Sequence, residues 1–481
     1  MNGVALRNPA QAVQGAGAPL GLGVAGVAAG ALLTLAAMKA GGPEYAPVLL
    51  LVLALAPLAT LAVVGHRLTG AILVLAVFPL GSIRVATPGL ETQLVELTVF
   101  LVAALVVLRR LSIGLRPLAW APPLWWALGL LAWAIVCTPS AVDQALALKQ
   151  DAVLTAGIVF AAALLATLRG VADVRVMLGA FLVVGVGVAA AALSEPVQLQ
   201  ATSAGETVGG RLQGAFDHPN QLGLFCALAA MIATGLAFGA RSRAARYASG
   251  LALPVVLGAL IFSLSRGAWI GTGLGFLYLL VVLREARRAL ILVALPFVVI
   301  GALFGSFAPG GTDIHVVTLR AQALTTLSPY DARPAIYSEA VREIKTNPVT
   351  GVGPGGFPIA SERAGSESST VFADHAHDLW LTWAAEDGLP ALALILVFTI
   401  SLGLASSRAG RAASDRGERR DRAVICGIAA GLIAVLGQGI FDYLLRNAVL
   451  WILVWGLIGA LLVCAREYGA FGPVPPRQPV R

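Results

Sequence analysis

Two arginines and their surroundings give the first indication of chemistry in this sequence. Arg211 begins RLQGAFDHPN, which leads directly into an apolar run, and Arg266 lies in SLSRGAW, in a short turn between two apolar runs. An arginine at a membrane boundary faces a cavity, a partner or an anion, or extends to the lipid headgroups. For Arg211 the structural alternative is an interfacial side chain beside a helix N-cap, Asp217 or Asn220. Because guanidinium groups match phosphate oxygens bidentately and stay charged, the pair predicts a phosphate or pyrophosphate ligand.

A second group of candidate residues is the histidine pair His375 and His377 in ADHAHDLWLTWAAEDGLP, just before another apolar run. Neutral imidazole is an available base near pH 7, and a neighbouring carboxylate, Asp374 or Asp378, would orient its ring. A metal site needs more ligands than an HxH pair supplies, and the cysteines are widely separated. We therefore expect a general base here, with no metal and no cofactor.

Gly353 and Gly355 belong to a third motif, the glycine-rich segment PVTGVGPGGF at 348–357. It lacks the Lys-Ser/Thr ending of a nucleotide P-loop and the strand–helix context of a dinucleotide site, so a nucleotide site is not expected. Two interpretations remain open. The segment is either a tight turn that lets the backbone approach a neighbour, or a backbone nest that binds an anionic ligand.

The elements that must position these residues are membrane helices. Of the 481 residues, 58% are hydrophobic and only 12% are charged, with a mean hydropathy of +0.85, which excludes a soluble enzyme. A helix that crosses a bilayer core needs roughly 20 apolar residues. We predict an all-α polytopic membrane protein with about 12–14 transmembrane helices and one large external loop subdomain, which the resemblance given below makes periplasmic. Its apolar runs lie at 17–38, 47–65, 70–80, 93–108, 118–136, 150–167, 176–193, 220–239, 248–264, 268–283, 289–306, 389–405, 423–441 and 446–464.

The distribution of positive charge predicts the topology of these spans. Most of the 33 Lys and Arg residues fall in alternate, mostly short connections, as the positive-inside rule expects of cytoplasmic loops. Both termini are then cytoplasmic. The net charge of +8 is scattered in short clusters, which argues against nucleic-acid binding. The same alternation places Arg211, Arg266, the glycine-rich segment and the histidine pair together on the external side of the membrane.

One external segment, 307–388, is far longer than an ordinary connection and is predicted to be a subdomain. Within it, residues 332–345 have the spacing of a helix, with one apolar face formed by Ile336, Ala340, Val341 and Ile344. The chain is therefore divided into N-terminal spans (1–200), core spans (201–306), the periplasmic subdomain (307–388) and C-terminal spans with a short tail (389–481).

These motifs, in this order, resemble the bacterial O-antigen ligase and O-antigen polymerase superfamily of integral membrane glycosyltransferases. The segments that carry the resemblance, within about residues 205–400, are RLQGAFDHPN, SLSRGAW, RPAIYSEAVREIKTNPVTGVGPGGF and HAHDLWLTWAAEDGLP. Ligases of this family have a His followed eleven residues later by Gly. His377 and Gly388 match that spacing, whereas His375 would meet Glu386. Asp378 departs from the pattern, because many relatives have Asn there.

The resemblance implies a metal-independent, inverting transfer of a glycan from undecaprenyl pyrophosphate to an acceptor hydroxyl on the periplasmic face. It implies that Arg211 and Arg266 bind the pyrophosphate leaving group and that His377 acts as general base on the acceptor. Arg333 and Tyr337, on the predicted external helix, would line the sugar or acceptor cleft. The full predicted substrate-binding set is Arg333, Tyr337, His375, Asp378, Gly353 and Gly355.

Three functions stay open at this point. The His-to-Gly spacing and the single external loop favour an O-antigen ligase that transfers to a lipid A–core sugar. The alternative is a polymerase of O-antigen or exopolysaccharide repeat units. A lipid-linked glycan flippase or a secondary transporter is more distant, because the middles of the apolar runs almost lack charged residues. We expect a bacterial inner-membrane protein whose partners are a lipid-linked glycan donor, a lipid A–core or growing-glycan acceptor and membrane lipid.

Overall fold

The computed structural model describes residues 68–80, 84–87, 90–112, 121–195, 211–284, 287, 291, 313–322, 332–368 and 375–472. Apart from one antiparallel hairpin, β1 (Arg84–Thr87) with β2 (Leu90–Gln93), its regular elements are helices. The predicted class, an all-α polytopic membrane protein, is confirmed.

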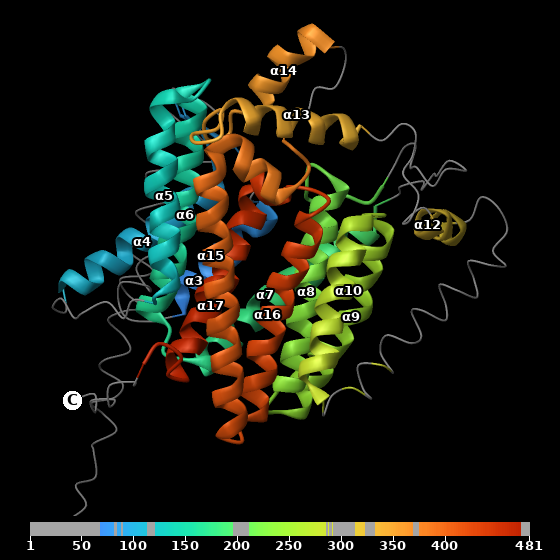
Figure 1. Cartoon of the computed structure of the whole chain (residues 1–481). Helices are drawn as coiled ribbons and strands as arrows, with labels where there is room; N and C mark the ends of the chain where they lie inside the picture. Colours follow the sequence, from blue (N-terminus) through green and yellow to red (C-terminus); the bar gives the residue numbers. More distant parts are fainter. Residues whose placement is uncertain are drawn as a thin grey trace, which may run out of the picture.

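The helices form one bundle with a cap of shorter helices (Figure 1). Three short 3-10 turns, η2 (Phe78–Leu80), η3 (Thr138–Ser140) and η5 (Leu444–Arg446), lie between them. The α-helices of the described residues are α3 (Thr69–Val77), α4 (Leu94–Ser112), α5 (Pro123–Cys137), α6 (Gln144–Thr167), α7 (Val171–Leu193), α8 (Pro219–Gly239), α9 (Arg243–Phe262), α10 (Arg266–Val282), α12 (Asp313–Gln322), α13 (Arg333–Thr346), α14 (Phe357–Ser368), α15 (Leu379–Asp415), α16 (Arg419–Gly439) and α17 (Ala448–Glu467).

Within the described ranges, 8 helices are long and apolar enough to cross a membrane: α5 to α9 and α15 to α17. The apolar part of α4 and the whole of α10 are shorter. The predicted runs at 17–38, 47–65 and 289–306 lie outside the described residues, and each of the other predicted runs corresponds to a helix. The total of 12–14 spans therefore stays a prediction.

Glycines allow the central helices to approach closely. A Cβ added at Gly235 of α8 would lie 2.8 Å from the Cα of Gly427 on α16, and one at Gly275 of α10 would lie 2.9 Å from the carbonyl oxygen of Ala430. Small residues at such crossings allow van der Waals packing between helices that share a membrane. As a result α8, α16 and α17 form the centre of the bundle, whereas α15 is the least buried of the long spans.

The connections between spans gather at two ends of the bundle. At the first, which we call the site end, Arg211 Nε donates to Ser263 O (2.9 Å) and Val142 N donates to Val352 O (2.9 Å). These contacts join the segment before α8 to the α9–α10 turn, and the α5–α6 connection to the glycine-rich segment. The connections predicted to be periplasmic therefore share one end. The other is called the opposite end below.

The cap consists of α13, α14 and the first turns of α15, packed around Ile336, Ala340, Phe357, Ala376 and Ala385. The predicted helix at 332–345 is present as α13. Its buried face contains Ile336 and Ala340 as expected, but the prediction for Val341 is wrong, because that side chain is 39% exposed. The cap covers the face of α13 that contains Ile336 and Ala340 and leaves Val341 exposed.

Helix α15 is kinked where the predicted subdomain ends. Gly388 has φ 80° and ψ 177°, and the next residue, Leu389, donates its N–H to Pro348 O (2.9 Å). A Cβ at position 388 would overlap the carbonyl of Val349, so glycine is required both by the backbone angle and by this close approach. The glycine eleven residues after His377 thus ends the short helix that His377 precedes. The predicted domain boundaries themselves stay predictions.

Candidate active site

The segment before α8 holds Arg211 through a chain of side-chain hydrogen bonds. Arg211 Nη2 donates to Asn220 Oδ1 (2.8 Å), and Asn220 Nδ2 donates to Asp442 Oδ2 (2.8 Å). The helix N-cap is His218, whose Nδ1 accepts from Asn220 N (3.1 Å), so the prediction of Asp217 or Asn220 as the cap is wrong. Asn220 does not cap the helix. Its side chain links Arg211 to Asp442, which lies between α16 and α17.

Arg266 is the first residue of α10 and follows a strained turn. Ser265 is the N-cap, and its Oγ accepts from Ala268 N (3.4 Å). The preceding residue, Leu264, has φ 53°. A positive φ is costly for a residue with a branched side chain, and such strain gathers at functional sites. The turn therefore fixes the direction in which α10 starts and places Arg266 at the pocket described below.

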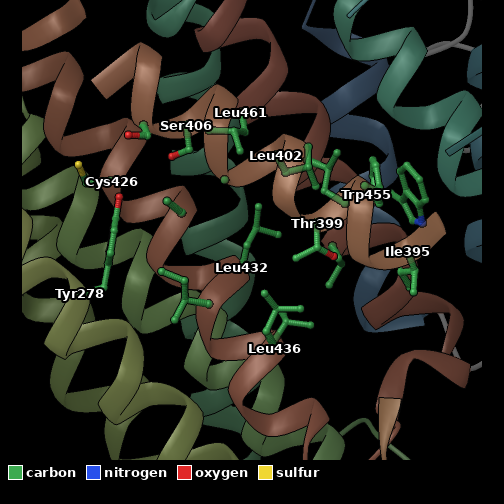
Figure 2. Close-up of a pocket in the computed structure, with 18 of the residues that line it drawn as sticks. Tyr278, Ile395, Thr399, Leu402, Ser406, Cys426, Leu432, Leu436, Trp455 and Leu461 are labelled. Carbon is green, nitrogen blue, oxygen red and sulfur yellow. The ribbon is translucent and has the colours of Figure 1, made fainter. Parts of the chain in front are cut away.

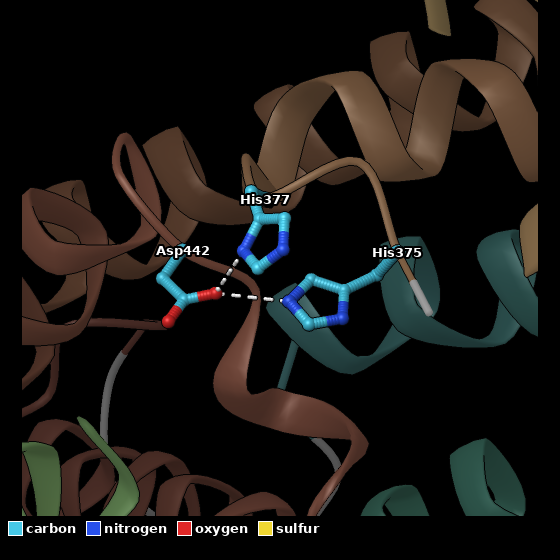
Figure 3. Close-up of side chains that lie close together, drawn as sticks. All are labelled: His375, His377 and Asp442. Atoms are coloured by element: carbon cyan, nitrogen blue, oxygen red, sulfur yellow. Dashed lines mark hydrogen bonds and ion pairs between the residues drawn. The ribbon is translucent and has the colours of Figure 1, made fainter. Parts of the chain in front are cut away.

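His375 and His377 share one carboxylate, that of Asp442. His375 Nε2 lies 2.9 Å and His377 Nδ1 3.0 Å from the same oxygen, Oδ1 (Figure 3). The two rings are tilted, with centroids 4.3 Å apart. Both ring nitrogens donate if Asp442 is ionised. Burial by itself would raise the pKa of Asp442, but hydrogen bonds from the two histidines outweigh it and hold that pKa below its usual range.

The two histidines differ in their access to the pocket. The side chain of His377 is 30% exposed and lines the pocket, whereas that of His375 is 15% exposed and does not line it. His377 also has a positive φ of 50°, and Tyr337 Oη donates to its carbonyl oxygen (3.4 Å). In the described part of the chain, His377 and Leu264 are the non-glycine residues with positive φ. Tyr337 therefore supports the backbone of His377, and it does not line this pocket.

A pocket of about 340 Å³ brings most of these groups together. Four arginines from four segments line it, and Asp442 is its one lining carboxylate among the described residues. Burial, followed by the positive charge of Arg320, lowers the pKa of Arg211. The lining residues are Arg211, His218, Asn220, Ser265, Arg266, Gly267, Arg320, Ala332, Arg333, Ile336, His377, Gln438, Phe441 and Asp442. Such an excess of buried positive charge favours an anionic ligand.

Gly353 and Gly355 lie away from this pocket. Gly355 N donates to Glu386 Oε2 (3.1 Å) and Gly353 N to Glu386 O (2.8 Å), while Arg446 pairs with the Glu386 carboxylate. A Cβ on Gly353 would overlap Ala141. The anion that contacts this turn is therefore a carboxylate of the protein itself, and the structure favours the tight-turn interpretation over a nest for substrate.

Asp378 is a helix cap in this structure. It is the N-cap of α15, and its Oδ1 accepts from Leu381 N (2.7 Å). Burial raises the pKa of Asp378. The sequence predicted that Asp374 or Asp378 orients His377. That was wrong for Asp378, since the ring is bonded to Asp442, and Asp374 lies outside the described residues.

Sequence reasoning missed Asp442 and Arg320. Arg320 comes from α12, and its Nε donates to Leu264 O (3.3 Å), which brings it against the turn before Arg266. Asp442 lies in the short connection between α16 and α17. An acidic residue in a short connection at the same side as Arg211 was the available indication, because charged groups at such positions mark functional pathways.

His375, His377 and Asp442 also offer three ligand atoms within 4.8 Å of one another, which is the arrangement of a candidate metal site. Both ring nitrogens, however, contact the same carboxylate oxygen, and two arginines, Arg211 and Arg266, line the same pocket. Nearby positive charge opposes a bound cation. The arrangement is better suited to a hydrogen-bonded histidine pair, and the absence of a metal stays a prediction.

Comparison with known proteins identifies the central part of the chain. Residues 251–396 match the family described as O-antigen ligase. The match contains Arg266, Arg333, His375 and His377, while Arg211 precedes it. No curated protein matches the chain. The resemblance that the sequence predicted is confirmed over the matched residues.

Proposed function

We propose that the chain is an inner-membrane glycosyltransferase of the O-antigen ligase and polymerase superfamily, because residues 251–396 match the O-antigen ligase family and the described helices include eight candidate membrane spans. The protein transfers a glycan from undecaprenyl pyrophosphate to an acceptor hydroxyl of a lipid A–core sugar. The transfer inverts the anomeric carbon and uses no metal. The observation that carries this proposal is the arginine-lined pocket with His377 at its wall.

The arginines bind the pyrophosphate in this proposal. Arg211 uses Nε and Nη2 for protein contacts, so its other N–H groups remain for phosphate oxygens. Arg266 reaches the pocket from the start of α10. When the bond between the sugar C1 and the phosphate oxygen breaks, the leaving pyrophosphate gains one negative charge. Fixed guanidinium groups stabilise that charge as it develops, without reorganisation at the moment of reaction.

His377 is the general base. Its Nδ1 is bonded to Asp442, so with Nδ1–H donating to the carboxylate the lone pair lies on Nε2. Nε2 accepts the proton of the acceptor hydroxyl while that oxygen attacks C1 from the side away from the pyrophosphate. Asp442 keeps the ring in the required tautomer and stabilises the imidazolium that forms, the role of the carboxylate in a catalytic triad. Asn220 joins Asp442 to Arg211, so the base and the phosphate site share one hydrogen-bond network.

The site faces the periplasm in this proposal. Its support is that the pocket lies at the site end, while the connections rich in arginine, around 241–246 and 408–422, lie at the opposite end. Short basic loops remain cytoplasmic during insertion. Reaction of cysteine variants with an impermeant thiol reagent in intact spheroplasts tests this. Labelling at Ala332→Cys and protection at Arg420→Cys are expected, and the reverse pattern contradicts the orientation.

The central test is the pair His377→Ala and His375→Ala. We expect His377→Ala to lower glycan transfer by about 10²–10⁴-fold, the usual contribution of general acid–base catalysis, with normal membrane insertion. His375→Ala removes a partner of the same carboxylate but leaves the pocket-lining ring, so its loss should be smaller. Full activity of His377→Ala, measured with purified donor and acceptor, would sink the assignment.

Ligase and polymerase are separated by the polysaccharide of a deletion strain. Loss of all capped lipopolysaccharide, with long lipid-linked polymer accumulating, indicates a ligase. Capping with single repeats indicates the alternative, a polymerase of O-antigen or exopolysaccharide.

The metal-free mechanism is tested with a chelator. A ligase and a polymerase are both expected to stay active when the purified enzyme is treated with it, and loss of activity would contradict the mechanism.

A further inference from the structure

A second cavity lies inside the membrane part of the bundle, away from the arginine-lined pocket. It has a volume of about 330 Å³ and separates α15 from α16 and α17, with α10 beside it (Figure 2). Its walls are almost entirely apolar, as Phe398, Leu402, Leu432 and Trp455 illustrate. We call this cavity the α15–α16 crevice.

The α15–α16 crevice is long. On α15 its lining runs without a wide gap from Ile395 to Arg411, with Leu379 and Trp383 nearer the site end, and on α16 it runs from Leu436 to Arg422. At a rise of 1.5 Å per residue, the stretch of α15 from Ile395 to Arg411 spans about 24 Å. This length exceeds one leaflet, which supplies roughly half of a hydrocarbon core of about 30 Å. The dimensions therefore fit an extended hydrocarbon chain lying parallel to the helices.

The crevice is polar at one end, and that end is the opposite end of the bundle. Ser406, Ser407, Arg411 and Arg422 line it there. Backbone carbonyls hold both arginines: Arg422 Nη2 donates to Val282 O (2.8 Å) and Arg411 Nε to Ser407 O (3.4 Å). The result is two positive charges at the mouth of an apolar crevice.

The neighbouring acid is already paired. Asp421, which precedes Arg422, accepts from Arg175 (2.7 Å) and from the hydroxyl of Tyr468 (2.9 Å). Its charge is therefore compensated on the other side of α16. The negative charge of a lipid headgroup would complement the positive charges of Arg411 and Arg422 at the end of the crevice.

We propose that the α15–α16 crevice binds an anionic glycerophospholipid of the cytoplasmic leaflet, with an acyl chain between α15 and α16 and its phosphate on Arg411 and Arg422. The polyprenyl donor is a poorer occupant, because its pyrophosphate belongs to the pocket at the other end of these helices. Lipid reaches the crevice along α15, whose outer side chains Ile400 (60% exposed) and Leu404 (50% exposed) face the membrane.

The bound lipid has a structural consequence for the active site, which rests on the proposed function. His377 lies just before Asp378, the N-cap of α15, and Asp442 lies in the connection that follows α16, so the separation of these two helix ends affects the distance between the two side chains. At the site end the helices touch, since a Cβ on Gly439 would lie 3.1 Å from the Cβ of Leu379. The crevice, which Leu379 also lines, separates the two helices along the rest of their length. A lipid chain there supports the spacing along the rest of their length.

Tryptophan fluorescence tests the binding directly, without an activity assay. Trp383, Trp451 and Trp455 line the crevice. Wild-type protein is reconstituted in nanodiscs that contain phosphatidylcholine and a small fraction of phosphatidylglycerol, with one lipid brominated at a time. Brominated phosphatidylglycerol is expected to quench more than the same fraction of brominated phosphatidylcholine. Equal quenching by the two lipids overturns the proposal.

Charge variants locate the headgroup. Arg411→Gln with Arg422→Gln should lower the preference for phosphatidylglycerol on the order of 30-fold, since each arginine near a membrane surface contributes about a fivefold factor. The matched control is Arg408→Gln with Arg420→Gln, two exposed arginines at the same end that do not line the crevice. Arg411→Lys with Arg422→Lys keeps the charges and should keep the preference, which separates charge from folding.

Two results overturn the proposal at this stage. One is a lipid preference that falls equally in the control and the crevice variants, which would assign it to general surface charge. The other is the absence of phosphatidylglycerol from the lipids that mass spectrometry detects on the wild-type protein released from the membrane. Because the proposed glycan transfer is tested separately through His377→Ala, a failure here leaves that proposal unaffected.

Discussion

The two ends of the helix bundle use arginine in opposite ways. At the opposite end the arginines connect helices to one another: Arg466 donates to Leu165 O and Leu168 O (both 2.6 Å), and Arg175 pairs with Asp421 (2.7 Å). At the site end Arg211 and Arg266 line a pocket in which Asp442 is the one lining carboxylate among the residues that the structure describes. The first set of arginines joins helices to one another, and the second surrounds a pocket.

This difference teaches which charges are structural and which are functional. An arginine bonded to helix-terminal carbonyls satisfies acceptors that a helix leaves unpaired, and so stabilises the bundle. Arginines gathered around a pocket repel one another, and a bound anion lowers that repulsion. The arginines around the pocket are therefore suited to binding an anion, while the arginines of the opposite end contribute stability.

The largest effect on activity, after that of the general base, is expected from Arg266→Ala. Loss of one fixed donor to the leaving group should lower kcat by about 10²–10³-fold. The matched variant at the opposite end is Arg466→Ala, which should lower thermal stability and leave the activity per folded molecule unchanged. Steady-state rates and melting curves on both proteins measure this. Equal effects of both variants on kcat would break the comparison between the two ends.

Asp442→Asn should have the next largest effect, on the order of 100-fold in kcat, because His377 loses its orienting carboxylate while the arginines remain. The KM for the lipid-linked donor should change little. A rise in KM for the donor without a fall in kcat would show that Asp442 contributes to substrate binding, and it would contradict the positioning role.

The same aspartate predicts a pH dependence of stability. Its folded-state pKa is lowered, so its contribution to stability is complete above the pKa of a free aspartic acid, about 4, and is lost as the pH falls below that value. Wild-type melting temperatures measured between pH 3 and pH 6 should therefore decline toward acid more steeply than those of Asp442→Asn. Identical slopes would show that the carboxylate is not held ionised.

The smallest effect on activity is expected from Asp421→Asn, at the opposite end. Asp421 accepts from Arg175 and from Tyr468, so the variant leaves partly buried donors poorly paired and should cost about 3 kcal/mol of stability. Transfer per folded molecule should stay at the wild-type level. A large loss of turnover in folded protein would show that the two ends are coupled.

Much of the fold and part of the site follow from sequence patterns. The apolar runs predicted the described spans, and the alternation of basic connections predicted that Arg211, Arg266 and His377 share one end. Local patterns did not identify Asp442, because its pairing with the histidines joins residues 65 and 67 positions apart through the packing of α15 against α16. The glycine-rich segment was ambiguous for the same reason, since its anion, Glu386, comes from another helix.

The sequence by itself determined a membrane protein with an arginine pair, a histidine pair and a family resemblance, because hydropathy, charge bias and short motifs are local properties. Tertiary structure decided which histidine lines the pocket, which carboxylate holds it and which arginines surround it. It also decided that a crevice separates the helices that hold His377 and Asp442. Those facts depend on distances between helices, and the packing of their side chains fixes such distances.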